Sequence, residues 1–337
     1  MESVFLDYGT VSGGDLDPSS LMTRLADLQL LEFTADRDVA DRIRHAEIVL
    51  LNSVRITREL LAASPRLELL GLAATGTDNI DLVAARERGI AVCNVRGYCT
   101  MSVAQHVWSM ILGLTQRLAR FAAHQMNPVR KDPDWRDPVR KDPVRKDPDW
   151  WTTAYQSLPD PPIRELAGRA LGIVGWGELG RAVARIGEAF GMHVLIADRP
   201  GAAPQAGRID LAELLRTADV VSLHCPLTDT TRGMIGAAEL GSMKSDALLI
   251  NTARGALVDG HALAAALRAG KLGGAGIDVL PEEPPVHGDP LLDPAIPNLV
   301  LTPHIAWAAR EARQRCLDEL ALNVEDFFRG GSRGRVV

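Results

Sequence analysis

A glycine-rich stretch near the middle of the chain has residue types and a spacing that could bind a dinucleotide. Gly175, Gly177 and Gly180 form a G-x-G-x-x-G pattern directly after a strand-like run and at the start of a helical pattern. The first glycine permits a tight turn, the second lets the backbone approach a pyrophosphate, and the third lets helix and strand pack closely. Glu178 and Leu179 begin the helix, whose free N–H groups would face the phosphates. A glycine-rich turn without a ligand is the alternative, but the strand, the helix and an acidic residue further on favour the dinucleotide site.

That acidic residue also bears on the choice of cofactor. Asp198 ends the next strand-like run, 198 − 180 = 18 residues after Gly180. A carboxylate there can accept hydrogen bonds from the adenosine ribose and repels a 2′-phosphate. Arg199, the next residue, could instead hold that phosphate. We therefore expect NAD as the cofactor and regard NADP as less favoured.

Short apolar runs alternate with helical patterns on both sides of this motif. The runs before it are VFLDYG, LQLLEFT, AEIVLLN, LELLGLAATG and IAVCNV, and those that follow are ALGIVG, HVLIAD, ADVVSLHC, DALLIN, GAGIDVL and NLVLTP. Such alternation predicts parallel sheets with helices on both faces. Because the glycine motif begins only after a complete α/β unit, the fold class we predict is α/β with two doubly wound parallel-sheet domains.

The order of these elements suggests where one domain interrupts the other. We predict a Rossmann-type NAD domain at 102–304, inserted in a flavodoxin-like substrate-binding domain made of 1–101 and 305–337. A helical pattern covers 102–124, with Ser102 and Gln105 as a capping box. A last helical stretch, 307–328, has no strand-like run after it.

Residues 127–151 repeat with a period of five, which fits neither a helix nor a strand. Trp side chains among basic residues could grip nucleic acid, but seven Arg or Lys against six Asp nearly cancel the charge. We interpret this stretch as an insertion in a helix-to-strand loop of the NAD domain.

Composition limits the class of protein further. The chain has 337 residues, 46% of them hydrophobic, and a net charge of −6, which disfavours nucleic acid or an anionic membrane as the main partner. Its four cysteines are scattered without a C-x-x-C pair, which fits reduced thiols in a cytoplasm and predicts no metal site. No signal peptide is visible, and no apolar run approaches the roughly 20 residues of a membrane span.

Five longer motifs occur in an order and at a spacing that resemble a known family. They are NVRGYCTMSVAQHVW, IRELAGRALGIVGWGELGRAVA, NTARGALVDGHAL, GIDVLPEEPP and NLVLTPHIAWAAREARQR. The chain resembles the D-isomer-specific 2-hydroxyacid dehydrogenases along its whole length except for residues 127 to about 160, and most of all their glycerate dehydrogenase (hydroxypyruvate reductase) branch. The resemblance implies NAD(H)-dependent hydride transfer on a small D-2-hydroxy acid, such as D-glycerate or glycolate. It also implies a homodimer built around the helix that begins at Ser102.

The same resemblance implies a catalytic triad of Arg254, Glu283 and His304. Arg254 can hold the carboxylate of a 2-keto acid with its planar fork and polarise the carbonyl. Protonated His304 would give a proton to the carbonyl oxygen as hydride reaches the carbon. Glu283 would favour the imidazolium, although Glu282 in the same loop could take its place.

Further contacts with cofactor and substrate are implied by the resemblance. The adenosine side would be lined by Cys225 and Pro226, and the nicotinamide half by Thr252, Ala253 and Asp278. Asp278 would accept a hydrogen bond from the carboxamide. Thr75 and Gly76, in LAATGTDNID, would offer backbone N–H groups to the substrate carboxylate, and a plain turn is the alternative there.

Other interpretations stay open at this point. We interpret His106, His124 and His224 as structural or cofactor-lining residues. A non-catalytic NAD(H)-sensing or corepressor-like protein could share the fold and the triad. A phosphoglycerate-type dehydrogenase would need a basic pocket. A formate-type enzyme would resemble relatives that carry Gln where this chain has Glu283.

Overall fold

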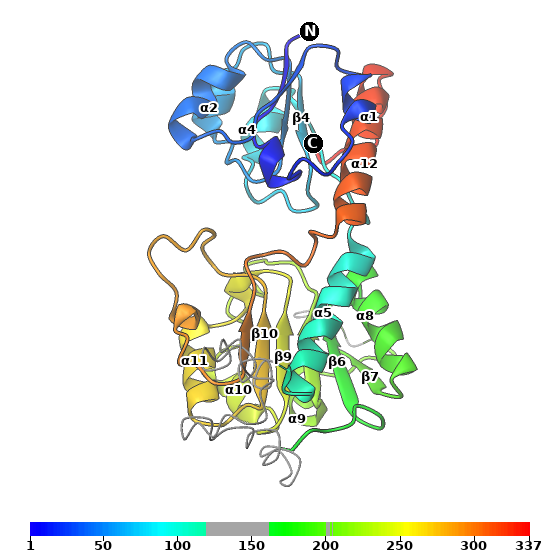
Figure 1. Cartoon of the computed structure of the whole chain (residues 1–337), viewed down its shortest axis with the longest axis vertical. Helices are drawn as coiled ribbons and strands as arrows, with labels where there is room; N and C mark the ends of the chain where they lie inside the picture. Colours follow the sequence, from blue (N-terminus) through cyan, green and yellow to red (C-terminus); the bar gives the residue numbers. More distant parts are fainter. Residues whose placement is uncertain (119–161, 200–202, 204) are drawn as a thin grey trace, which may run out of the picture. The chain divides into compact units, whose positions relative to one another are not determined.

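The computed structural model describes residues 1–118, 162–199, 203 and 205–337. These residues divide into two compact units, each with its own sheet (Figure 1). Unit 1 consists of Met1–Ser102 and Trp307–Val337, and unit 2 of Val103–Ala306. The five-residue repeat lies outside the described residues.

The sheet of unit 1 has five parallel strands in the order β2-β1-β3-β4-β5. This is the flavodoxin-like order, which confirms the predicted architecture. The strands are β1 (Ser3–Phe5), β2 (Leu28–Leu30), β3 (Ile48–Leu51), β4 (Leu69–Leu72) and β5 (Ala91–Cys93).

Alternating side chains of these strands build two cores, one on each face of the sheet. Phe5 and Leu50 belong to one buried cluster, whereas Val4 and Val49 belong to the other. Successive residues of a strand point to opposite faces, so continuous apolar runs are what a sheet covered on both faces requires. The helices of this unit are α1 (Ser19–Met22), α2 (Asp36–Ile43), α3 (Arg58–Ala62), α4 (Leu82–Glu87) and α12 (Arg310–Phe328), with the short helix η1 (Tyr8–Thr10).

The last residues of the chain add to the outer edge of this sheet. Arg335 forms an antiparallel bridge with Cys93, and the Val336 N–H donates to the Val92 carbonyl at 2.8 Å. As expected, no strand follows α12 in the described chain, and the tail makes only this isolated bridge. Edge strand β5 offers unpaired backbone groups, and a short tail can satisfy them without any strand-like sequence pattern.

Unit 2 contains a six-stranded parallel sheet in the order β11-β10-β9-β8-β6-β7. Its strands are β6 (Ala170–Val174), β7 (His193–Ile196), β8 (Val220–Leu223), β9 (Leu248–Asn251), β10 (Gly274–Ile277) and β11 (Leu299–Leu301). Its helices are α5 (Thr100–Thr115, which begins in unit 1), α8 (Glu178–Ala189), α9 (Leu211–Thr217), α10 (Ala237–Ser242), α11 (Gly260–Arg268), η3 (Gly255–Leu257) and η4 (Pro290–Leu292). Each of the six strand-like runs from ALGIVG to NLVLTP contains one of these strands. None of the helices described in either unit has the length and apolar character needed to cross a membrane.

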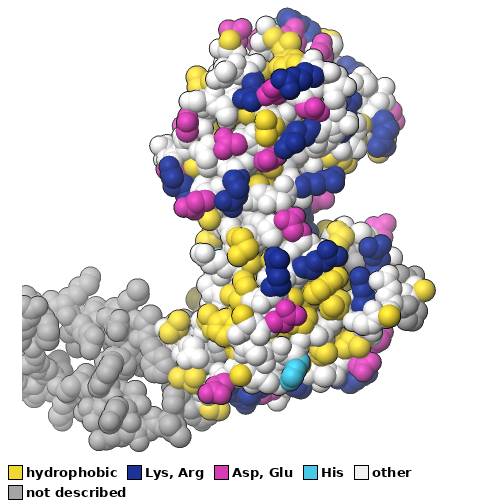
Figure 2. All heavy atoms as spheres, turned by 90° about the vertical axis from the view of Figure 1, so that its right-hand side faces the viewer, with side chains coloured by type: hydrophobic (Ala, Val, Ile, Leu, Met, Phe, Trp, Pro, Cys, Tyr) yellow, Lys and Arg dark blue, Asp and Glu magenta, His cyan; other side chains and the backbone are white. Residues whose placement is uncertain are grey.

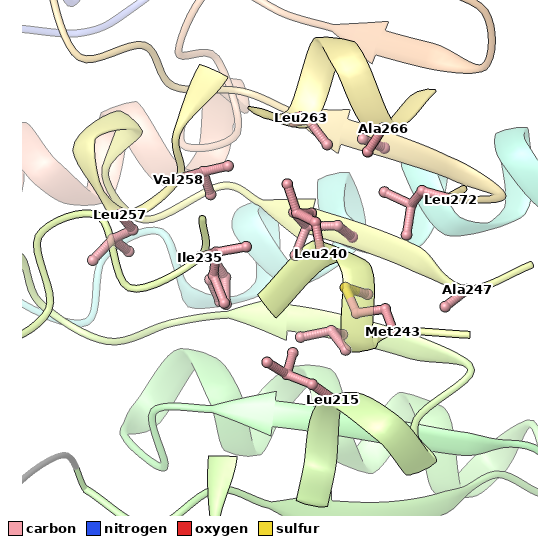
Figure 3. Close-up of a cluster of buried hydrophobic side chains, with 14 of the residues drawn as sticks. Leu215, Ile235, Leu240, Met243, Ala247, Leu257, Val258, Leu263, Ala266 and Leu272 are labelled. Atoms are coloured by element: carbon pink, nitrogen blue, oxygen red, sulfur yellow. The ribbon is translucent and has the colours of Figure 1, made fainter. Parts of the chain in front are cut away.

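Each face of the second sheet is covered by a different set of helices. Leu215 of α9, Leu240 of α10 and Leu263 of α11 meet in one buried cluster (Figure 3). On the other face α5 packs directly on β10. A Cβ atom at Gly276 of β10 would lie only 2.8 Å from the sulfur of Met110 in α5. The glycines of β10 therefore set how closely α5 approaches the sheet.

Helix α5 differs from its prediction at both ends. It begins at Thr100, so Ser102 is not its cap; the Ser102 hydroxyl instead accepts a hydrogen bond from the Ala309 N–H at 3.3 Å. It ends at Thr115. Arg117, two residues later, has a left-handed backbone with φ 57°, a conformation that does not occur inside a right-handed helix. Residues 119–124 of the predicted helix lie outside the described residues.

Candidate active site

The turn between β6 and α8 lies where the order of the sheet reverses direction. Strand β6 lies between β7 and β8, so the chain passes from β6 to β7 on one side and then crosses to β8 on the other side. Ligands of open α/β sheets bind at such points, beyond the carboxyl ends of the strands. Gly175 has φ 109°, and a Cβ atom there would lie 2.5 Å from the His224 carbonyl carbon after β8. Gly180 lies against the Gly175 carbonyl, which leaves no room for a side chain.

The residues of this turn fit a dinucleotide. A Cβ atom at Gly177 would meet nothing within 4 Å, so the space above the turn is open. Gly177 is the N-cap of α8 and has no side chain that could accept a hydrogen bond from the first turn. Glu178 and Leu179 are the first residues of that helix. Among the described residues, the Thr252 hydroxyl and His224 Nδ1 are buried without a partner. An uncapped helix N-terminus and polar atoms in need of partners suit a phosphate-bearing ligand.

Asp198 follows β7, as expected for a residue that reaches the ribose. Its Oδ1 accepts a hydrogen bond from the Gln205 N–H at 3.1 Å, which orients the half-buried carboxylate. Arg199 beside it is exposed. The contact of Asp198 with a ribose stays a prediction.

The two residues that directly follow β8, His224 and Cys225, are uncharged and packed against the sheet. Burial lowers the pKa of His224 to about 4 and raises the pKa of Cys225 to about 11. His224 is therefore a neutral imidazole at neutral pH, with Nε2 2.9 Å from the Ser222 hydroxyl. A neutral imidazole suits a structural or cofactor-lining place better than a proton donor. The contacts of Cys225 and the exposed Pro226 with adenosine stay predictions.

The loop that carries Arg254 is held by a buried residue that sequence reasoning missed. Asn251, at the end of β9, is fully buried; its Nδ2 donates to the Arg254 carbonyl at 2.9 Å and its Oδ1 accepts from the Ala253 N–H at 3.1 Å. The side chain therefore holds the second and third residues of the Thr252–Arg254 turn. An asparagine at the end of an otherwise apolar strand was the available signal, since a buried amide must find partners.

Gly255 brings this loop against the loop that carries Glu283. A Cβ atom at Gly255 would collide with the backbone of Leu280 and Pro281, so only glycine permits this approach. The two loops follow neighbouring strands β9 and β10. The Arg254 charge is close enough to Glu283 to lower the pKa of that carboxyl.

Glu283 and His304 form a direct pair. His304 Nδ1 lies 2.6 Å from Glu283 Oε2, and Glu283 Oε1 accepts from the Leu280 N–H at 2.7 Å. Burial would raise the pKa of Glu283, but the hydrogen bond and charge of His304, the Leu280 N–H and the Arg254 charge together hold this pKa below its usual value. Glu283 is thus ionised at neutral pH. The alternative, Glu282, contacts His287 Nδ1 at 2.7 Å instead.

The turn that presents His304 is folded around one buried carboxylate. Asp278 is 1% exposed; Oδ1 accepts from the Thr302 hydroxyl at 2.5 Å and the Ile305 N–H at 2.9 Å, and Oδ2 accepts from the Ala306 N–H at 2.9 Å. The Asp278 carbonyl also accepts from the His304 N–H at 2.7 Å. His304 has φ 53°, a left-handed conformation that such bonds stabilise. Asp278 is therefore a positioning residue for His304, and its predicted bond to a carboxamide stays a prediction.

The same network reaches α5. His106 Nε2 lies 3.0 Å from the Thr302 hydroxyl and 3.5 Å from Asp278 Oδ1. This places His106 behind the turn, in a structural position. His124 lies outside the described residues.

The predicted substrate loop belongs to unit 1. Thr75 and Gly76 follow β4, where the Thr75 hydroxyl donates to the Val95 carbonyl at 2.7 Å and the Thr75 carbonyl accepts from Asn94 Nδ2 at 2.6 Å. These bonds tie the loop to the end of β5. Its contact with a substrate carboxylate stays a prediction.

Unit 2 thus brings a guanidinium, a carboxylate and an imidazole to the carboxyl ends of β9, β10 and β11. An imidazole paired with an ionised carboxylate can exchange a proton with a substrate oxygen, and a guanidinium can bind a carboxylate. Across the described part of the chain, no group of three or more His, Cys, Asp or Glu side chains could hold a metal ion. This set of groups suits the reduction of a carbonyl that stands beside a carboxylate.

Comparisons with known proteins agree with this chemistry. A family model, "D-isomer specific 2-hydroxyacid dehydrogenase, NAD binding domain", matches residues 135–306. The chain is 42% identical over 293 residues to a glycerate dehydrogenase of Methylorubrum extorquens, covering 87% of this chain and 86% of that protein. It is 34% identical over 337 residues to a hydroxypyruvate reductase of Blautia hydrogenotrophica, covering 98% of both. The structure of a D-lactate dehydrogenase from Aquifex aeolicus, complexed with NAD and lactic acid, matches with a TM-score of 0.80 and 29% identity over 100% of this chain and 99% of that one.

Proposed function

The chain belongs to the D-isomer specific 2-hydroxyacid dehydrogenases, and on this premise we propose that it interconverts hydroxypyruvate and D-glycerate, with glyoxylate and glycolate as a second substrate pair. As a member of this family it is an NAD-dependent oxidoreductase that acts on a small D-2-hydroxy acid. A non-catalytic NAD(H)-sensing or corepressor-like role is not favoured, because the similar proteins are named as dehydrogenases and reductases.

The observation that carries the proposal is the His304–Glu283 pair, 2.6 Å apart, beside the Arg254 loop. Bound NADH supplies the hydride. Arg254 binds the substrate carboxylate and polarises the carbonyl, which orients the carbon that receives the hydride. Protonated His304 then gives its proton to the oxygen that gains negative charge, and in the reverse direction neutral His304 takes the proton back. Ionised Glu283 stabilises the imidazolium between these steps.

The choice of substrate is tested with a panel of 2-keto acids. We expect hydroxypyruvate, and then glyoxylate, to give the highest kcat/KM with NADH, followed through the loss of NADH absorbance. Pyruvate, longer 2-keto acids and a phosphorylated hydroxypyruvate serve as comparisons. Turnover of none of them would contradict the proposal, and a preference for the phosphorylated compound would point to the phosphoglycerate-type alternative.

Asp198→Ala tests the choice between the two nicotinamide cofactors. The substitution removes a ribose partner and a charge that repels a 2′-phosphate, while exposed Arg199 is left to pair with that phosphate. We expect the KM for NADH to rise and the KM for NADPH to fall, each by about tenfold, which is ~1.4 kcal/mol. Asp210→Ala, at the cap of α9, is a control with the same change of charge. Preference of the unaltered protein for NADPH would contradict the role given to Asp198.

Glu283→Gln tests the pairing with His304 through pH. The amide keeps the shape but removes the carboxylate whose pKa the pairing lowers. The carboxylate that pairs with His304 is then absent, so the loss of keto-acid reduction with rising pH should begin at lower pH than in the unaltered protein. In the oxidative direction, which needs neutral His304, activity should extend to lower pH. Profiles of kcat/KM in both directions check this, with Glu282→Gln as the control. An unmoved profile would show that the two residues are not coupled.

We also propose a homodimer that forms through the face of unit 2 made by α5 and α8. Hydrophobic side chains gather on this face (Figure 2). Phe190, at the end of α8, is 41% exposed although its ring stacks on Trp108 of α5 at 4.9 Å. Light scattering after size exclusion should give roughly 73 kDa, twice the 36.4 kDa of one chain. A mass near one chain would contradict the dimer.

The four free cysteines support the cytoplasmic location expected from the sequence.

A further inference from the structure

Helix α5 places a histidine behind the turn that presents His304. Met110 of α5 lies against Gly276 of β10. His106 is four residues before Met110, so it lies on the same face of the helix, one turn earlier. Asp278 is two residues after Gly276, where its N–H still donates to the neighbouring strand, so it lies on the same side of β10. The two elements therefore bring His106 Nε2 to within 3.5 Å of the buried Asp278 carboxylate.

The hydrogen bonds around Thr302 run in one direction. Main-chain N–H groups donate to both carboxylate oxygens of Asp278, from Ile305 to Oδ1 and from Ala306 to Oδ2. The Thr302 hydroxyl therefore gives its one proton to Asp278 Oδ1, at 2.5 Å. Its oxygen then accepts from His106 Nε2, 3.0 Å away, so this nitrogen carries a hydrogen whether the ring is neutral or charged. A chain of bonds thus leads from His106 through Thr302 to Asp278.

The donors to Asp278 matter because this residue holds the turn of His304. The His304 N–H donates to the Asp278 main-chain oxygen at 2.7 Å, and His304 has a left-handed backbone with φ 53°. Such a conformation persists only where the surrounding bonds hold it. A buried carboxylate that loses a donor is destabilised where it stands. Loss of a donor to Asp278 therefore loosens the turn and displaces the His304 ring.

We propose that His106 and Thr302 are positioning residues for His304, which act through Asp278. Thr302 supplies one of the donors to the buried carboxylate, and His106 orients and polarises that donor. The proposal rests on the proposed function, in which His304 gives a proton to the carbonyl oxygen. Because a misplacement of about 1 Å can cost roughly 100-fold in rate, the pair acts on kcat more than on the KM for the keto acid.

Paired substitutions test this role through steady-state kinetics with hydroxypyruvate and NADH. Thr302→Val removes the hydroxyl but keeps the shape, and we expect kcat to fall about 10- to 100-fold. His106→Leu removes the donor to that hydroxyl, and we expect a fall of about tenfold. Thr302→Ser keeps the hydroxyl, and His106→Gln places an amide N–H near the position of Nε2, so both should stay within about threefold of the unaltered kcat. The KM for hydroxypyruvate and the affinity for NADH should change little.

Amide hydrogen exchange of the same variants tests the turn without any turnover. The N–H groups of residues 304–306 all donate to Asp278. Their exchange, followed by mass spectrometry, should be about tenfold faster in Thr302→Val and His106→Leu and unchanged in Thr302→Ser and His106→Gln. Thermal unfolding followed by circular dichroism shows whether each variant is folded. His106→Asn, whose shorter amide does not reach the hydroxyl, replaces His106→Leu if the leucine variant does not fold.

Two substitutions elsewhere on α5 are matched controls. Gln105 is exposed, and the Thr115 hydroxyl donates to the Ile111 carbonyl at 2.8 Å in the last turn of the helix. Gln105→Leu and Thr115→Val make the same kinds of change away from the His304 turn. Both should keep the kcat and the exchange rates of the unaltered chain.

An unchanged kcat in Thr302→Val, or an equal loss in Thr302→Ser and His106→Gln, would overturn the positioning role. So would a defect confined to NADH affinity or to thermal stability, with kcat retained. If the unaltered chain reduces no 2-keto acid, the proposed function fails. Faster exchange in Thr302→Val and His106→Leu would then still support the hold of the pair on the turn, and unchanged exchange would overturn it.

Discussion

His304→Ala is expected to lower kcat for keto-acid reduction by about 10²–10⁴ while the affinity for NADH changes little. The substitution removes the proton donor, whose Nδ1 lies 2.6 Å from Glu283 Oε2 and whose turn is held by Asp278. The Asp278 bonds use the N–H groups of Ile305 and Ala306, so alanine leaves the turn in place. Steady-state kinetics with hydroxypyruvate, together with fluorescence titration of NADH, measures the two effects separately.

His287→Ala is the matched control for this experiment. His287 lies in the same part of the chain but pairs with Glu282, and its side chain is 83% exposed. We expect its kcat to equal that of the unaltered protein. A small effect of His304→Ala, or an equal effect of His287→Ala, would remove His304 from the role of proton donor.

Arg254→Ala is expected to lower kcat/KM for the keto acid by about 10²–10³, or ~3–4 kcal/mol. The loss should lie mainly in substrate binding and orientation, because the guanidinium pairs with the substrate carboxylate. The loop itself is held by Asn251 through main-chain groups, which the substitution does not touch. Any fall in NADH affinity should therefore be small.

Arg254→Lys and Arg216→Ala complete this test. Lysine keeps the charge but not the planar fork, so we expect its kcat/KM to lie between those of the alanine variant and the unaltered protein. Arg216 is exposed in the last turn of α9, and its removal should have no effect on kcat/KM. A lysine variant no better than alanine would show that geometry dominates charge, whereas an active Arg254→Ala enzyme would exclude Arg254 from substrate binding.

Two features of the site could be predicted, the dinucleotide turn from neighbouring residues and the triad from a resemblance. Gly175, Gly177 and Gly180 stand at a spacing that serves one βα turn, and the structure shows that turn, with no room for a side chain at Gly175 or Gly180. The triad was predicted from a family resemblance, and the structure brings Arg254, Glu283 and His304 to adjacent loops at one edge of the sheet.

The supporting residues were not predictable in the same way. Asp278 was predicted as a cofactor contact, yet its carboxylate also holds the turn of His304, more than twenty residues away in sequence. Asn251 drew no prediction at all, although it fixes the loop of Arg254. The choice between Glu282 and Glu283 could not be made from composition, since adjacent residues of one loop differ only in where their side chains point.

The sequence by itself determined the two parallel sheets, the strands within them and the dinucleotide turn, because apolar periodicity and glycine spacing act over a few neighbouring residues. Only the tertiary structure decided where α5 begins and ends, that the tail pairs with β5, and that Glu283 rather than Glu282 contacts His304. These features depend on hydrogen bonds and close contacts between residues far apart in sequence. Such bonds follow from the packed arrangement of the strands, which no local pattern contains.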